Sequence, residues 1–210
     1  MLSRLFASCL LLLFTASFAW SGPQGPAEIK TYQGKELSPF DRLYDNAVEN
    51  PLERQANKKS YRLKVDGLVA NPLSLTYEQA LALPHVRRVV DMPCVEGWTE
   101  TLLYEGVRLV DLLEKAGLKP GADRVVFHTV GKRYTSSLSL AYVKKADLLL
   151  GFKINGLTLD QKRGFPFQAV APGKLGYKWV KWIERVEVID KPRLGYWEQR
   201  GYSDQADAKR

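Results

Sequence analysis

Turn signals divide this 210-residue chain into short segments, and their spacing constrains the fold more than any other feature. Gly67, the Asn71-Pro72 pair, Pro84 and Gly117 each end a short patterned run. Glycine adopts backbone angles that other residues avoid, and proline ends helices and interrupts strands. The runs between these signals are too short for the alternation of strands and long helices that builds a doubly wound parallel sheet. We therefore expect short strands and a few short helices.

Alternating and β-branched runs predict the strands. Tyr61, Leu63 and Val65 alternate with polar residues, as in a strand that buries one face. The same reasoning predicts extended chain at residues 86–90, 99–104, 124–130, 147–154, 157–159, 165–171 and 183–189. Asn155-Gly156 joins two of these runs, and this pair is a strong signal for a two-residue hairpin turn.

Three short helices are expected between the strands. Thr76 and Gln79 have the spacing of a capping box, in which each side chain satisfies a backbone N–H of the other. The apolar residues between 107 and 113 predict a second helix. Ser139 is placed to cap a third helix over residues 140–145. The sequence therefore predicts one α+β domain of mixed sheets with short helices.

The first 21 residues have the pattern of a secretory signal peptide. Arg4 supplies a positive charge, residues 5–14 are almost wholly apolar, and small residues follow. This apolar run is shorter than the roughly 20 residues that span a membrane. We therefore expect a periplasmic or otherwise exported protein with a cleaved signal peptide over residues 1–21, without a twin-arginine motif; an uncleaved N-terminal anchor is the alternative. Residues 22–60 are expected to form an arm that packs on a domain of residues 61–204, and residues 205–210 a flexible tail.

Cys94 is the only cysteine that remains once the signal peptide is removed together with Cys9. A disulfide framework is therefore excluded. Pro93 and Gly97 hold Cys94 in a tight loop, where a lone thiol is either a buried small hydrophobe or a reactive group. Export to an oxidising compartment favours a role for Cys94 as a metal ligand, as a nucleophile or in an intermolecular disulfide bridge.

The two histidines, His85 and His128, are too few for a histidine-based metal centre. A Cys–His nucleophile pair, with either histidine as the base for Cys94, is kept as an alternative.

The formal net charge of +8 comes from basic residues that are scattered among acidic ones. The chain has neither a basic arm nor a nucleic-acid-binding motif, so no nucleic acid is expected as a partner. Lysines and aromatic residues alternate around Gly176 between residues 174 and 182. Gly176 allows backbone N–H groups to approach an anion, Lys178 offers a point charge for phosphate, and Arg163 offers a second cation. The alternative is a strand with buried tryptophans and solvated lysines.

Three runs, in this order, resemble the molybdopterin-binding domain of the sulfite oxidase family. They are Cys-Val-Glu-Gly-Trp at residues 94–98, Arg-Gly-Phe-Pro-Phe-Gln at 163–168 and Gly-Tyr-Lys-Trp-Val-Lys-Trp-Ile at 176–183. The runs Gly-Tyr-Trp-Glu at residues 195–198 and Gly-Tyr-Ser at 201–203 resemble the exported bacterial branch of that family. The resemblance extends over residues 28–204.

This resemblance implies an α+β fold around a molybdopterin cofactor, with Cys94 as the catalytic thiolate ligand of molybdenum. A soft thiolate on a rigid loop suits such a metal. Resemblance to the methionine sulfoxide reductase branch implies further cofactor-binding residues: Thr129, Gly176, Tyr177 and Lys178, together with Arg42, Tyr44 and Asn46 in the arm. This chain has Arg163 where many relatives carry His or Asn, and Gln168 where they carry arginine, so Arg163 is expected to supply the cation that Gln168 lacks.

The implied activity is a two-electron oxygen-atom transfer on a small oxo or sulfur compound. The chain contains no haem or flavin motif, so the electrons are expected to pass to or from a separate protein, such as a cytochrome or a membrane haem subunit. A metal-free binding or scaffold protein of the same fold is the alternative.

Overall fold

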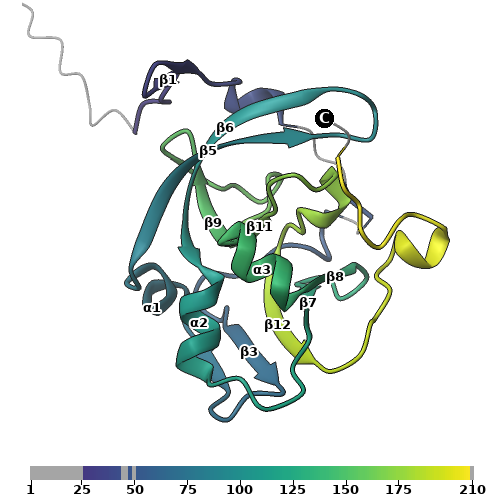
Figure 1. The fold of residues 1–210 in the computed structure, drawn as a ribbon. Helices are drawn as coiled ribbons and strands as arrows, with labels where there is room; N and C mark the ends of the chain where they lie inside the picture. The colour runs from purple at the N-terminus through teal and green to yellow at the C-terminus, as the bar shows by residue number, and fades with distance from the viewer. Residues whose placement is uncertain (1–25, 44–46, 49–50, 209–210) are drawn as a thin grey trace, which may run out of the picture.

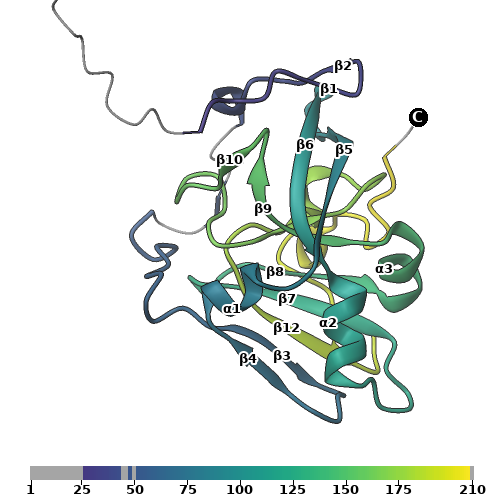
Figure 2. The ribbon, with the colours of Figure 1, turned by 90° about the vertical axis from the view of Figure 1, so that its left-hand side faces the viewer.

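The computed structural model describes residues 26–43, 47–48 and 51–208 of the chain. The predicted signal peptide and the predicted site residues Tyr44 and Asn46 lie outside the described residues. Two five-stranded sheets, three short α-helices and a small N-terminal hairpin account for the regular structure of the described part (Figures 1 and 2).

The first sheet, here called the hairpin sheet, is antiparallel throughout. Its strand order is β10 (Leu157–Thr158), β9 (Leu149–Ile154), β6 (Thr99–Arg108) and β5 (His85–Pro93), and β11 (Gln168–Val170) also pairs with β9. The long β5–β6 hairpin crosses the top of the molecule in Figure 1. Asn155 and Gly156 turn β9 into β10 with positive φ angles of 51° and 81°, which confirms the predicted hairpin.

The second sheet, here called the mixed sheet, lies at the bottom of Figure 2. Its order is β4 (Leu73–Leu75), β3 (Leu63–Gly67), β12 (Ile183–Ile189), β7 (Arg124–Thr129) and β8 (Thr135–Ser139). β3 and β12 are parallel, and the other neighbours are antiparallel. The mixed sheet therefore joins strands from both ends of the domain, and the α+β prediction is confirmed.

The three α-helices are α1 (Tyr77–Leu81), α2 (Leu109–Ala116) and α3 (Leu140–Ala146). Gln79 N donates to Thr76 Oγ1 at 3.1 Å and Thr76 N donates to Gln79 Oε1 at 2.9 Å, so the predicted capping box is confirmed. Ser139 caps α3, because its Oγ accepts from Tyr142 N at 3.2 Å. Single 3₁₀ turns are η1 (Phe40–Arg42), η2 (Gly176–Lys178) and η3 (Glu198–Arg200).

Some boundaries differ from the sequence prediction. Val107 belongs to β6 rather than to a helix, because it pairs with His85 and Leu150 across the hairpin sheet. Only the last part of the predicted strand at residues 165–171 is paired, as β11. β8 was not predicted, because its Ser136 and Ser137 are buried through side-chain hydrogen bonds instead of apolar packing.

One hydrophobic core fills the space between the two sheets. Leu102 and Tyr104 of the hairpin sheet and Val65 and Phe127 of the mixed sheet are each 0% exposed. No helix among the described residues is long and apolar enough to cross a membrane.

Both ends of the described chain are attached to the domain. In the arm, which contains β1 (Thr31–Tyr32) and β2 (Lys35–Glu36), Glu28 Oε1 accepts from Phe40 N at 2.6 Å and from Asn155 Nδ2 at 3.1 Å. At the other end Ala206 is 1% exposed, and Lys174 Nζ donates to Asp207 Oδ1 at 2.6 Å. The tail expected to be flexible therefore packs against the domain over residues 205–208.

Candidate active site

The loop between β5 and β6 holds Cys94 at the wall of a cavity. Cys94 N donates to Trp98 O at 2.8 Å, and Gly97 N donates to Cys94 O at 3.2 Å. Gly97 has a φ of 88°, which strains any other residue. Trp98 Nε1 donates to Glu96 Oε2 at 2.9 Å, which fixes a carboxylate two residues after the thiol. The loop thus presents a partly buried thiol and a carboxylate from a rigid turn.

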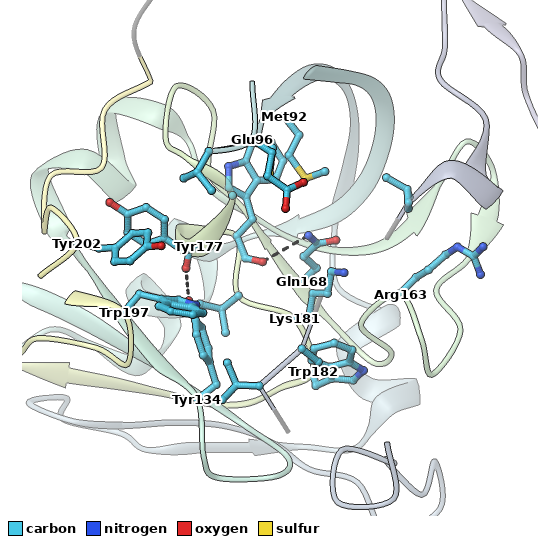
Figure 3. Close-up of a pocket in the computed structure, with 18 of the residues that line it drawn as sticks. Met92, Glu96, Tyr134, Arg163, Gln168, Tyr177, Lys181, Trp182, Trp197 and Tyr202 are labelled. Atoms are coloured by element: carbon cyan, nitrogen blue, oxygen red, sulfur yellow. Dashed lines mark hydrogen bonds between the residues drawn. The ribbon is translucent and has the colours of Figure 1, made fainter. Parts of the chain in front are cut away.

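The cavity has a volume of about 450 Å³, within the range of roughly 300–1,000 Å³ that is usual for small-molecule and cofactor pockets. Figure 3 shows it between the loop of residues 94–98, here called the cysteine loop, the turn η2, and residues 190–208 after β12, here called the C-terminal segment. Its walls are largely aromatic: Trp98, Tyr104, Tyr134, Tyr177, Trp179, Trp182, Trp197 and Tyr202. Its reactive or polar lining residues include Cys94, Glu96, Arg163, Gln168 and Lys181.

Gln168 is held at the inner end of the cavity by two hydrogen bonds. Tyr104 Oη donates to Gln168 Oε1 at 3.2 Å, and Gln168 Nε2 donates to Trp179 O at 3.4 Å. Burial raises the pKa of Tyr104 far above its usual value, so its hydroxyl remains a donor at neutral pH. Gln168 therefore contributes a neutral amide to the cavity wall.

Arg163 lines the cavity, as predicted, but its charge is shared with other groups. Its Nε donates to Phe40 O at 2.9 Å, and its guanidinium lies 4.4 Å from the centre of the Phe40 ring. Its NH1 also forms an ion pair with Asp160. Arg163 thus connects the arm to the cavity wall.

Lys178 does not reach the cavity, in contrast to the role expected for it. Its side chain is 0% exposed, and its Nζ forms an ion pair with Glu198 and another, at 3.1 Å, with Asp204. Ser137 O accepts a third hydrogen bond at 3.1 Å. The 3₁₀ turn η2 directs Lys178 into the C-terminal segment, whereas Lys181, three residues later, lines the cavity.

Some of the other predicted site residues line the cavity and others do not. Gly176 and Tyr177 line the cavity, and Gly176 lies against the cysteine loop, so that an added Cβ would be 3.8 Å from Pro93 O. Thr129 is buried beside the cavity and its Oγ1 donates to Tyr134 O at 3.2 Å. Arg42 is exposed, with its Nε 3.9 Å from Glu100. The structure thus brings Cys94, Arg163, Gln168, Gly176 and Tyr177 together, but not Lys178, Thr129 or Arg42.

The C-terminal segment supplies a wall that sequence reasoning did not assign. Tyr177 Oη donates to Ser203 O at 2.7 Å, and Tyr134 Oη donates to Tyr177 O. The rings of Trp197 and Tyr202, whose centroids are 5.1 Å apart, complete this side of the cavity (Figure 3). Burial raises the pKa of Tyr177 to about 12. The aromatic Gly-Tyr-Trp run was the available signal, but its partner residues lie far away in the sequence.

The donor chemistry of the cavity suits a metal that an organic ligand carries. Among the described residues no group of three or more His, Cys, Asp or Glu side chains could hold a metal ion by itself. The described lining residues do not include His85 or His128; His128 Nε2 lies 2.8 Å from Glu187 on the mixed sheet. The cavity therefore offers one thiol, one carboxylate, aromatic walls and two cations, a set that fits molybdopterin, and it gives no support to a Cys–His pair.

Comparison with known proteins agrees with this geometry. Residues 49–197 match the family model described as the oxidoreductase molybdopterin binding domain. The uncharacterized oxidoreductase YuiH of Bacillus subtilis (strain 168) is 33% identical over 148 residues, which cover 70% of this chain and 74% of that protein. The putative protein-methionine-sulfoxide reductase subunit YedZ1 of Azospira oryzae is 34% identical over 166 residues, 79% of this chain and 61% of that protein.

More distant relatives point to the same family. The sulfite oxidase of Arabidopsis thaliana is 27% identical over 201 residues, which cover 79% of this chain and 51% of that protein. Among solved structures, the sulfane dehydrogenase SoxCD from Paracoccus pantotrophus matches with a TM-score of 0.61 and 29% identity, over 65% of this chain and 40% of that chain.

The chain therefore spans 74% of the length of YuiH, but only 40–61% of the other three proteins. The match to the family model, over residues 49–197, covers more than half of the chain. This chain belongs to the family of oxidoreductases with a molybdopterin-binding domain, and it is a molybdenum-dependent oxidoreductase of the sulfite oxidase type.

Proposed function

We propose that this chain is an exported oxidoreductase that carries out a two-electron oxygen-atom transfer on a small oxo or sulfur compound, with molybdopterin in the cavity and Cys94 as a ligand of its molybdenum. The observation that carries the proposal is the position of Cys94. The only cysteine among the described residues lies on a tight loop that lines the largely aromatic cavity. A thiolate on a rigid turn is the kind of ligand that a soft metal centre needs.

The cavity residues would hold the cofactor by distinct means. Gly176 and Tyr177 bring backbone groups of η2 next to the cysteine loop, where they can donate to an anionic group. Lys181 would bind the phosphate of the cofactor through charge, and Arg163, which already pairs with Asp160, would support the wall beside it. Gln168, which Tyr104 orients, would form a hydrogen bond with the polar edge of the cofactor without adding charge. In this assignment Lys178 supports the cavity wall from behind and does not contact the cofactor.

The bound cofactor supplies a metal that exchanges an oxygen atom and two electrons with substrate. The protein's contribution is to fix the thiolate, orient the substrate between aromatic rings and exclude bulk water from the inner end of the cavity. In the reductive direction, an S=O or N–O bond breaks, two electrons and two protons are consumed, and water is released. An oxidised sulfur compound is the favoured substrate class, because three relatives are named for sulfite, sulfane or methionine sulfoxide chemistry.

The electrons are proposed to come from, or pass to, a separate electron-transfer protein. The chain contains no CxxCH motif for covalent haem, so a second redox centre is not supplied by that route. The proposed export rests on the signal-like pattern of residues 1–21.

Elemental analysis of the protein purified from a host that makes molybdopterin tests this proposal. We expect close to one molybdenum per chain, together with reduction of a sulfoxide or an N-oxide by a reduced dye. Cys94→Ala should lose the activity. Protein without molybdenum would contradict the proposal and would favour the metal-free scaffold of the same fold.

A further inference from the structure

One acidic and two basic side chains line the cavity. Figure 3 shows Glu96 beside Met92, Lys181 near Gln168, and Arg163 at the edge of the cavity. Lys181 is also part of the lining, and its Nζ lies 5.5 Å from the centre of the Trp182 ring. Among the described residues no lysine or arginine forms an ion pair with Glu96, whose hydrogen-bond donor is the neutral Trp98 Nε1. Glu96 is therefore the only acidic side chain among the described lining residues.

The acidic residue lies on the same loop as the thiol. Glu96 follows Cys94 by two residues in the same turn, and both side chains line the cavity. Glu96 is exposed, and the hydrogen bond of 2.9 Å from Trp98 Nε1 holds its carboxylate against the loop. A substrate that approaches a metal bound to Cys94 would therefore come close to a negative charge.

We propose that Glu96 determines substrate specificity by excluding anionic oxo compounds and admitting neutral ones, such as sulfoxides and N-oxides. The inference rests on the proposed function, in which the metal lies at Cys94. Like charges repel, and a binding site rejects a competitor through an unfavourable charge as effectively as it selects through contacts. Lys181 is assigned to the cofactor phosphate and Arg163 already pairs with Asp160, so neither is assigned to neutralise Glu96.

The walls near Glu96 favour the same substrates. Trp98, Tyr177 and Tyr202 line the cavity with aromatic rings, which bind organic groups and do not satisfy the hydration needs of a small anion. A neutral sulfoxide presents one polar oxygen and two organic groups, so it matches a site with an aromatic wall and a single reactive end. A small anion such as sulfite would lose hydration and gain repulsion.

Steady-state kinetics of the molybdenum-loaded enzyme with two matched substrates tests the inference. Methyl phenyl sulfoxide is neutral, and 4-(methylsulfinyl)benzoate adds only a carboxylate to it. Glu96→Gln keeps an oxygen that can accept from Trp98 Nε1, so the loop geometry is retained while the charge is removed. We expect the ratio of kcat/KM for the anionic to the neutral substrate to rise at least about threefold at low salt, and the wild-type ratio to approach that of the variant in 1 M salt, where charges are screened within about 3 Å.

Asp91→Asn is the matched control, because Asp91 lies on β5 near the same loop but does not line the cavity. It removes the same charge and should leave the ratio unchanged. An unchanged ratio in Glu96→Gln would overturn the inference, and so would an equal rise in Asp91→Asn.

Fluorescence quenching provides a readout that does not depend on turnover. All four described tryptophans, Trp98, Trp179, Trp182 and Trp197, line this cavity, so their emission reports on it. Glu96→Gln should raise quenching by iodide, an anion, relative to quenching by neutral acrylamide, and Asp91→Asn should not. Equal iodide-to-acrylamide ratios in wild type and Glu96→Gln would overturn the inference. Because this measurement works on protein with or without molybdenum, failure of the proposed function is distinguished from failure of the role of Glu96.

Discussion

A buried ion pair connects the cavity wall to the C-terminal segment. Lys178 and Glu198 are both 0% exposed in their side chains, and Ser136 Oγ also donates to Glu198. Burial alone would raise the pKa of Asp204, but the neighbouring Lys178 holds it below its usual value. Each charged residue directly follows, or lies within two residues of, an aromatic residue of the cavity: Tyr177, Trp197 and Tyr202. The pair therefore stabilises the wall from behind.

Lys178→Met should destabilise the protein strongly. Removing the cation leaves Glu198 buried without its charge partner, which typically costs about 3–5 kcal/mol. Lys174→Met is the comparison, because the Asp207 side chain in its ion pair is 72% exposed; we expect a loss of about 1 kcal/mol or less from that pair. Urea unfolding followed by far-ultraviolet circular dichroism measures both values. Similar losses in the two variants would contradict the proposed role of the buried pair.

Lys181→Ala should affect cofactor retention rather than folding. Its side chain lines the cavity, so the variant should keep a near wild-type urea midpoint and lose molybdopterin more readily during dialysis. Lys162→Ala removes an exposed lysine of a neighbouring turn and serves as the control. The measurement is molybdenum per chain before and after dialysis, and equal retention in the two variants would count against a phosphate contact at Lys181.

The sequence could not distinguish these two lysines. Lys178 and Lys181 each precede a tryptophan, and both occur in the same basic, aromatic run. Their opposite environments depend on the η2 turn and on carboxylates at Glu198 and Asp204, which only the fold brings near. Cys94, Arg163 and Gln168 were expected as site residues from the family resemblance, and all three line the same cavity, while their binding roles stay predictions.

At the scale of elements, the pairing of β7 with β12 sets the surroundings of His128. In the mixed sheet, β7 and β12 bring His128 opposite Arg185, and His128 Nε2 lies 2.8 Å from Glu187 Oε2. Burial lowers the pKa of His128, and Arg185 adds to this effect, while the hydrogen bond to Glu187 opposes it. The net result is a histidine that is harder to protonate in the folded protein than in the unfolded chain.

Stability should therefore fall as the pH is lowered through this histidine. A lowered folded-state pKa means that the unfolded chain binds more protons, so the contribution is fully present above the unfolded value of about 6.5 and is lost below it. His128→Gln keeps a polar partner for Glu187 but does not titrate in this range. Urea unfolding at pH 7.5 and pH 5.5 should show a smaller loss in the variant than in wild type, and equal losses would refute this account.

The pairing of β6 with β9 depends on a glycine. A Cβ on Gly106 would lie 2.6 Å from Leu150 O, at the irregular register between Glu105 and Gly106. Gly106→Ala should therefore cost about 1–3 kcal/mol through forced separation of the strands. Gly176→Ala is the matched control, because its Cβ would be 3.8 Å from the nearest backbone atom, Pro93 O. Thermal unfolding of both variants checks this, and an unaffected Gly106→Ala would contradict the tight strand approach.

Elements with a local signal could be predicted, and those defined by distant partners could not. The capping box of α1, the Asn155-Gly156 hairpin and β12 follow from residues close together in the chain. β8 escaped prediction because its serines are buried by hydrogen bonds to residues about 60 positions away, at separations of 62 and 56. Alternation of apolar and polar residues is informative only where apolar burial orders the strand.

At the scale of the whole molecule, the cavity lies where separate parts of the fold meet. The hairpin sheet supplies the cysteine loop, η2 supplies Gly176 and Tyr177, and the C-terminal segment supplies Trp197 and Tyr202. The arm adds Leu43, and Phe40 accepts a hydrogen bond from Arg163. Because these parts are far apart in sequence, the site forms only when the complete domain has folded, and this couples cofactor binding to folding.

The most direct test of the central claim is molybdenum X-ray absorption spectroscopy on the purified protein. Wild type and Cys94→Ser, each loaded with the cofactor, are compared for the number of sulfur atoms bound to the metal. We predict one fewer molybdenum–sulfur contact in Cys94→Ser than in wild type. An identical sulfur count in the two proteins would contradict Cys94 as the ligand that places the metal in this cavity.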